Sequence, residues 1–151
     1  MSFPPPQLLP DTIKEITFFN NLIQSVYSLW FESDKLNTLH ESEALTTTDA
    51  TIATLDQIEL EENTTAHIHS TIVAVESGSG NRATYEIIGT FYRVLGPAVQ
   101  QGVTTSLHSI ESDGSWAVSY DVSANSARIR VTGAAASIDW RSSSRIMRLS
   151  N

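Results

Sequence analysis

The spacing of hydrophobic positions changes near residue 48, and this change divides the chain into two parts. Between residues 11 and 34, apolar residues recur every three or four positions, which is the period of an amphipathic helix. From about residue 49 onward, short runs of alternating apolar and polar residues are separated by turn-like clusters at residues 77–81 and 112–114. The pattern predicts an N-terminal helix followed by a β-rich body.

The predicted helix has an unusually wide apolar stripe. One seam with coiled-coil spacing contains Ile13, Ile16, Asn20, Ile23, Tyr27 and Trp30, and a second seam beside it contains Phe19, Leu22, Val26 and Leu29. Because a helix with one partner needs a narrower stripe, these residues are predicted to mediate attachment or oligomerisation. Asn20 fits self-association, since a polar seam residue can fix register and oligomer number. The alternative is that the helix packs across a sheet of its own domain.

The β-rich body contains seven predicted strands. They cover residues 51–60, 65–76, 82–95, 99–109, 116–123, 128–132 and 138–149. Trp116, Val118, Tyr120 and Val122 fall on one face of their strand, which is typical of antiparallel sheets with one buried side. No helical pattern separates the strands, so parallel crossovers are excluded. We therefore predict a mainly β fold, an antiparallel β-sandwich of jelly-roll-like type with an N-terminal α-helix.

The same patterns give the predicted domain organisation. Residues 1–10 hold four of the five prolines and form a Pro-rich N-terminal arm. Residues 11–34 form the amphipathic helix, and residues 35–48, rich in Ser, Thr and acids, form a linker. Residues 49–151 form the β-sandwich domain.

Composition excludes several classes of function. A net charge of -8 with nine basic residues argues against nucleic-acid binding, which needs clustered Lys and Arg. The absence of cysteine excludes disulfides and thiolate metal sites. No stretch approaches the roughly 18 apolar residues of a membrane span, so no membrane insertion is expected. The first residues lack the features of a secretory signal, and we expect a protein that is used without export.

Two pairs of residues are candidates for ligand binding. His67 and His69 lie two positions apart on a predicted strand, which places their imidazoles on the same face about 6 to 7 Å apart. Three copies of this strand at a symmetry axis would bring together enough imidazoles for a metal ion, although histidine is also a common half-buried strand residue. Trp140 and Arg141 can line a carbohydrate-binding surface or belong to the core.

No catalytic motif is present. The sequence has no G-x-S-x-G element for a Ser-His-Asp hydrolase and no phosphate-binding glycine loop. Carboxylates are too abundant for any pair to indicate glycoside hydrolysis. We predict no catalytic residues, no cofactor and no enzymatic activity.

Three segments resemble structural proteins of tailed-bacteriophage virions. Residues 16–34, ITFFNNLIQSVYSLWFESD, resemble a short apolar segment near the start of many such proteins. Residues 82–85, 91–93 and 109–113, followed by Trp116, are similar to a recurring β domain of phage virion proteins. The closing stretch, residues 131–136 with Ile138, Asp139 and Trp140, is the most specific part of the match.

The resemblance implies a virion component of the small tail-fibre or minor structural type, assembled in the host cytoplasm. It implies a homotrimer that attaches to other tail or capsid proteins through its N-terminal segment and exposes its β-sandwich, with a host surface glycan as a further partner. Two alternatives stay open at this point. One is a capsid decoration or cement protein, and the other is a stand-alone carbohydrate-binding module.

Overall fold

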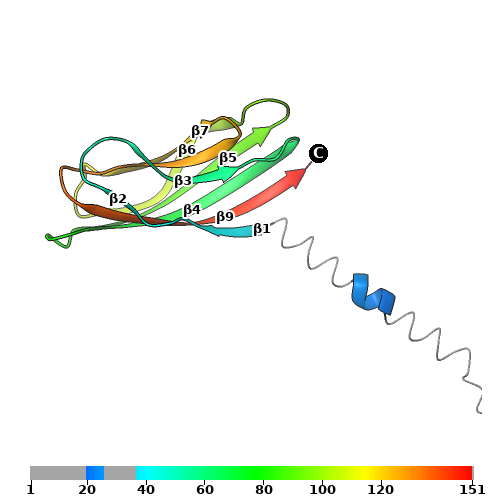
Figure 1. Ribbon diagram of the computed structural model, residues 1–151, viewed down its shortest axis with the longest axis horizontal. Helices are drawn as coiled ribbons and strands as arrows, with labels where there is room; N and C mark the ends of the chain where they lie inside the picture. The colour runs from blue at the N-terminus through cyan, green and yellow to red at the C-terminus, as the bar shows by residue number, and fades with distance from the viewer. Residues whose placement is uncertain (1–19, 26–36, 151) are drawn as a thin grey trace, which may run out of the picture. The chain divides into compact units, whose positions relative to one another are not determined.

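The computed structural model describes residues 20–25 and 37–150. The chain divides into two compact units, Met1–Lys35 and Leu36–Asn151. In the first unit, residues 20–25 are helical and exposed (Figure 1), as the sequence predicts for this part. No helix in the described ranges is long and apolar enough to cross a membrane.

Most of the predicted N-terminal features lie outside the described residues. These are the Pro-rich arm, the rest of the helix predicted over residues 11–34, and the seam residues Ile13, Ile16, Phe19, Val26, Tyr27, Leu29 and Trp30. Asn20, Leu22 and Ile23 are described. Their side chains are exposed, and the exposed fractions of Leu22 and Ile23 are 48% and 47%.

Within residues 37–150 the chain forms nine β-strands. They are β1 (Asn37–Glu41), β2 (Leu45–Thr47), β3 (Ala53–Glu59), β4 (Thr64–Glu76), β5 (Arg82–Arg93), β6 (Val99–Glu111), β7 (Ala117–Ser123), β8 (Ser126–Thr132) and β9 (Ile138–Ser150). The first sheet has six strands, in the order β1-β9-β4-β5-β6, with β2 also paired to β9. The second sheet has three strands, in the order β3-β8-β7.

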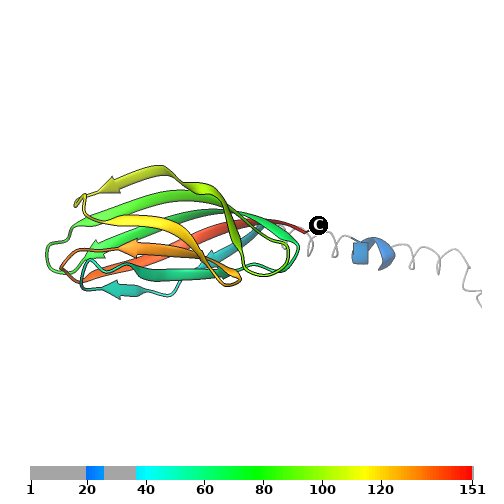
Figure 2. The same cartoon turned by 90° about the horizontal axis from the view of Figure 1, so that it is seen from above.

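The two sheets form the layers of a sandwich, with their strands roughly aligned (Figures 1 and 2). Every strand pairing in residues 37–150 is antiparallel. The predicted antiparallel β-sandwich is therefore confirmed. The jelly-roll-like connectivity is not confirmed by this strand order, because β4, β5 and β6 are consecutive neighbours in a meander.

Each of the seven predicted strands overlaps one of the strands from β3 to β9. The linker predicted over residues 35–48 is wrong, because this segment contains β1 and β2, which both pair with β9. Both strands are short and polar, and their sequence pattern therefore resembles that of a loop. Side chains of both strands also contact the rest of the domain. From β1, His40 Nε2 lies 3.1 Å from Asp56 Oδ1 on β3. On β2, Thr47 Oγ1 accepts a 2.9 Å hydrogen bond from Trp140 Nε1 of β9.

The hydrophobic core lies between the two sheets and is built mainly from alternate residues of β4, β5, β8 and β9. In β4 the buried positions are Ala66, Ile68, Ser70, Ile72 and Ala74. Every second residue is buried because successive side chains of a strand point to opposite faces of the sheet. In β8 of the other sheet, Ala127, Ile129 and Val131 are buried in the same way.

Aromatic rings pack tightly inside this core. The rings of Phe91 and Tyr120 meet edge to face, with centroids 5.3 Å apart, and those of Trp116 and Trp140 lie 5.8 Å apart. Gly89 leaves room for the first contact, since a Cβ at this position would lie 2.8 Å from the Phe91 ring. Aromatic pairs of this geometry contribute about 0.5 to 1.5 kcal/mol beyond the burial of their area.

A chain of buried hydroxyl groups connects the two sheets. The Tyr120 hydroxyl on β7 donates a 2.6 Å hydrogen bond to Ser70 Oγ on β4, and Ser70 Oγ lies 2.6 Å from Ser144 Oγ on β9. Burial raises the pKa of the Tyr120 hydroxyl, so this group remains a donor at neutral pH. Because a buried hydroxyl without a partner is costly, these bonds favour one position of the small sheet on the large one.

Replacing Tyr120 by Phe is expected to lower the free energy of unfolding by about 1 to 2 kcal/mol, since the change removes a hydrogen bond to a buried serine. Denaturant unfolding of the variant and the native chain measures the difference. Tyr92→Phe is the control, because Tyr92 is half-buried on the opposite side of the large sheet. Equal effects of the two substitutions would contradict a structural role for the buried hydroxyl chain.

Candidate functional site

Alternate residues of the six-stranded sheet point away from the three-stranded sheet, and we call the surface that they form the outer face. On β4 it contains Thr65, His67, His69, Thr71, Val73 and Val75, which pair with Leu149, Met147, Arg145, Ser143, Arg141 and Asp139 of β9. Directly paired residues lie on the same side of a sheet, so the outer face consists of rows that cross the strands. Since the inner face is buried in the core, the outer face is the broad surface that this sheet offers to other molecules.

The row through His69 shows the character of the outer face. From β1 to β6 it contains Leu39, Arg145, His69, Ile88 and Thr105. Apolar, cationic and hydroxyl-bearing side chains therefore stand next to each other in one row. This mixture differs from the inner face, where large apolar residues predominate.

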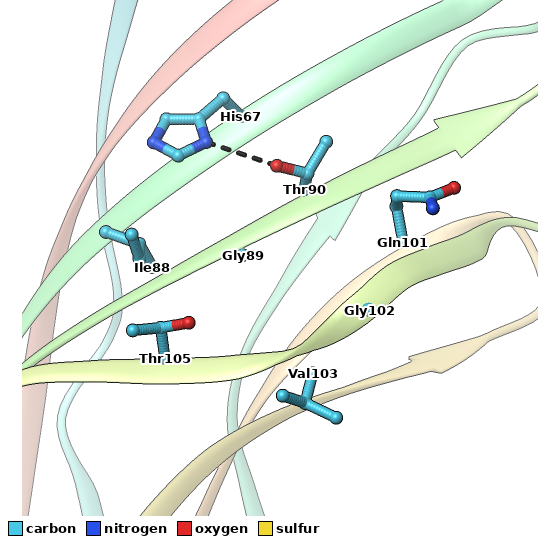
Figure 3. A pocket seen from close by; sticks show the side chains of 8 residues that line it. All are labelled: His67, Ile88, Gly89, Thr90, Gln101, Gly102, Val103 and Thr105. Carbon is cyan, nitrogen blue, oxygen red and sulfur yellow. Dashed lines mark hydrogen bonds between the residues drawn. The ribbon is translucent and has the colours of Figure 1, made fainter.

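His67 and His69 lie on the same face of β4, as the sequence predicts. His67 Nδ1 lies 3.3 Å from Thr90 Oγ1 on β5, and this contact borders a hollow of about 300 Å³ (Figure 3). Gln101 and Thr105 of β6 complete its far side (Figure 3). Polar side chains, the apolar residues Ile88 and Val103, and the glycines Gly89 and Gly102 all line the hollow.

The structure brings no third metal ligand to this histidine pair. His69 Nε2 lies 3.9 Å from Glu86 Oε2, without a hydrogen-bond partner, and Arg145 is the residue paired with His69 on β9. In the described ranges no group of three His, Cys, Asp or Glu side chains is arranged to hold a metal ion. A metal site at His67 and His69 would need ligands from other copies of the chain, and it stays a prediction.

The arginines of the outer face differ from those of the small sheet. Arg128 on β8 makes two hydrogen bonds to the Asp121 carboxylate, of 2.8 and 2.7 Å, and this carboxylate raises the pKa of Arg128. Arg82, Arg141 and Arg145 lie on the outer face and make no ion pair with the described residues. Three guanidinium groups on this face are therefore free to bind a partner.

Two further hollows lie on the outer face. One of about 400 Å³ is lined by Ala44, Val73, Val75, Asp139, Trp140 and Arg141. The other, of about 230 Å³, is lined by Leu39, His69, Thr71, Ser143 and Arg145. Together with the hollow at His67, they distribute concave surface over the whole sheet and do not form a single deep cleft.

The prediction that Trp140 lines a binding surface is wrong. Its side chain is 0% exposed, because it lies on the inner side of β9 and packs against Trp116 and Tyr85. Arg141 is the next residue on the strand, so its side chain points to the outer face and is exposed. The sequence pattern alone does not decide which of these two neighbours is buried.

Sequence reasoning missed most of the outer face. The alternation of Asp139, Arg141, Ser143 and Arg145 along β9 was visible in the sequence and indicates a polar face. The sequence pattern does not show that these residues pair with His69 and the other outer-face residues of β4. That pairing depends on strand register, which the sequence does not reveal.

Replacing Trp140 by Ala is expected to lower the free energy of unfolding by about 3 to 5 kcal/mol, because it opens a large cavity in the core and removes the partner of Thr47. Arg141→Ala, at the neighbouring exposed position, should change it by less than about 0.5 kcal/mol. Chemical unfolding in dilute solution measures both. A small effect of the tryptophan substitution would contradict its placement in the core.

Comparisons with known proteins give a likeness of fold and no family. Neither a protein-family model nor a curated protein matches the sequence. The crystal structure of the Acinetobacter baumannii phage AM24 tailspike protein is similar over 80% of this chain, with a TM-score of 0.51 and 8% sequence identity. The matched part is 27% of that tailspike chain. At this identity the likeness concerns the fold.

A second tailspike structure is similar at a lower level. It is gp49 of Acinetobacter baumannii bacteriophage Fri1, a capsular polysaccharide depolymerase, with a TM-score of 0.38 and 11% identity. The match covers 76% of this chain and 20% of the Fri1 chain. A TM-score below 0.5 is too low to support an argument, and the depolymerase activity belongs to that protein.

Proposed function

We propose that this chain is a structural component of a bacteriophage tail, of the fibre-like or accessory type, and that its β-sandwich is exposed on the virion. The observation that carries this proposal is the likeness of fold to the AM24 tailspike protein, which extends over 80% of the chain. The resemblance of the sequence to phage virion proteins supports the same assignment independently.

We propose further that the chain works as a homo-oligomer of three copies. The N-terminal segment would hold the copies together and attach them to other tail proteins. Support comes from the two apolar seams of the predicted helix, of which Leu22 and Ile23 are exposed in the described residues. An exposed pair of large apolar residues on a helix is stabilised when another helix or a partner surface covers it.

The alternative of a carbohydrate-binding module has lost its main support. Flat aromatic rings on a surface are what would stack on sugars, and the tryptophan considered for this role is buried. A capsid decoration protein would also expose a β-sandwich, but no observation favours it over a tail protein. The tail assignment is therefore the function that the fold supports best.

The full-length chain is expected to have a mass near three chains in solution, compared with 16.6 kDa for one chain. Light scattering after size exclusion at two concentrations measures this mass. Agreement between the two concentrations would show a stable assembly. A clean monomer at both would contradict the oligomeric part of the proposal.

Ile23→Asp is expected to lower the oligomer mass, because it introduces a charge into the predicted seam. Gln24→Asp is the matched control, since it places the same charge on the next residue, which is also exposed but lies outside both seams. Light scattering compares the two variants, and circular dichroism verifies that the sandwich stays folded. An unchanged mass for Ile23→Asp would show that the seam does not hold the copies together.

A further inference from the structure

The outer face has apolar side chains that no described residue covers. The three-stranded sheet packs on the other side of the large sheet, and residues on the outer face are exposed. They include Leu39, Val73, Val75, Ile110, Met147 and Leu149, with Val73 47% and Leu149 63% exposed. Single exposed apolar residues are normal on protein surfaces, but several on one face indicate an interaction site.

Charges of both signs lie among these apolar residues. Along β4 from Val75 to His69, successive rows carry Asp139 and Arg82, then Arg141, then Glu41 and Glu86, then Arg145. The arginines and carboxylates of the outer face are therefore equal in number, although the whole chain has a net charge of -8. A balance of this kind distinguishes the outer face from the rest of an acidic molecule.

The three arginines have no ion-pair partner in the described part of the chain, and the carboxylates are not paired with them. Asp139 accepts a hydrogen bond from Thr46, and Glu86 lies near His69. The pattern is self-complementary. If a second copy faces the first with its rows displaced by one step, Arg145 meets the row of Glu41 and Glu86.

The same displacement brings Arg141 opposite the row that carries Asp139 together with Arg82, and it brings the row of Glu41 and Glu86 opposite Arg141 of the other copy. Alternating charges on an otherwise apolar surface favour one arrangement of two facing sheets and disfavour others. A partner with a strong charge of one sign would meet repulsion in every second row. A second copy of the same face avoids this repulsion.

We propose that the outer face of the six-stranded sheet is a contact surface between copies of this chain. This inference rests on the proposed oligomer, and it adds a contact that is separate from the N-terminal segment. The contact buries Val73 and its apolar neighbours and pairs the arginines of one copy with the carboxylates of another. It gives the sandwich itself a part in assembly.

Cysteine labelling of the full-length chain tests whether this face is covered. The chain has no cysteine, so Val73→Cys and the control Ile52→Cys each introduce a single thiol. Ile52 precedes β3 of the small sheet and is 58% exposed. In an oligomeric sample a maleimide should label Val73→Cys at least about tenfold more slowly than the control, and the difference should be absent in a sample whose copies are separated.

Two outcomes of the labelling experiment would overturn the proposal. Equal labelling rates in a sample that light scattering shows to be oligomeric would mean that the outer face is free, while the proposed oligomer itself would stand. Protection of Val73→Cys that persists in a monomeric sample would mean that the chain's own N-terminal segment covers the face. A monomer at every concentration with equal rates would overturn both this inference and the proposed oligomer.

Replacing Val73 by lysine tests how much the contact contributes to self-association. Val73→Lys is expected to weaken self-association at least about tenfold, because it adds a cation to the row of Arg141 and removes an apolar contact. Leu95→Lys is the control, since Leu95 is 77% exposed in the turn after β5. Sedimentation of the full-length variants measures the dissociation constants, and equal constants for both variants would overturn the proposal.

Discussion

The pairing of β4 with both β5 and β9 is the interaction on which the rest of the structure depends. β4 forms hydrogen-bonded ladders with β9 from Thr64 to Glu76 and with β5 from Thr64 to Val75. These two ladders set the register of the central strands, and register decides which side chains face the small sheet. Slipping β4 by one residue would move Ile68 and Ser70 outward and His67 and His69 into the core. The Tyr120–Ser70–Ser144 hydroxyl chain opposes this slip, because its members would lose their buried partners.

Much of the fold could be predicted from the sequence because its strands are half-buried. In β8 the alternation of apolar and polar residues matches the burial directly. In β4 and β9 it matches over part of each strand, since Ser70 and Ser144 are buried and Val73 is exposed, and this is enough to predict both strands. β1 and β2 were missed for the opposite reason. They lie beside β9 at one side of the sheet, and most of their side chains are polar, so nothing in their composition distinguishes them from a loop. Their pairing partner lies about a hundred residues further along the chain, beyond the reach of local pattern analysis.

The sequence predicts single residues of the candidate site, but it does not predict which of them lie side by side on one surface. Two histidines that are two positions apart on one strand share a face, and this holds for His67 and His69. Which strands lie beside them depends on topology and register. The combination of His69 with Arg145 and Ile88 therefore emerges from two ladders together, β4 with β9 and β4 with β5. Trp140 and Arg141 show that the sequence also does not decide which of two adjacent strand residues faces the core. An aromatic residue next to an arginine can be placed on either face, and the choice depends on the phase of β9 relative to the core.

The two proposed contacts would together allow a small acidic sandwich without cysteine to assemble. When the N-terminal segments hold copies together, the outer faces meet at an effective concentration in the millimolar range, so the sheet contact need not be strong alone. Conversely, facing sheets in the proposed assembly would raise the effective concentration of the N-terminal segments for one another. Weak, charge-balanced contacts on the outer face also limit unwanted association of free chains, because the remaining surface keeps its net negative charge. In the proposed contact, the alternating arginines and carboxylates would therefore serve selectivity more than strength, and they would direct an exposed apolar sheet towards its own copies.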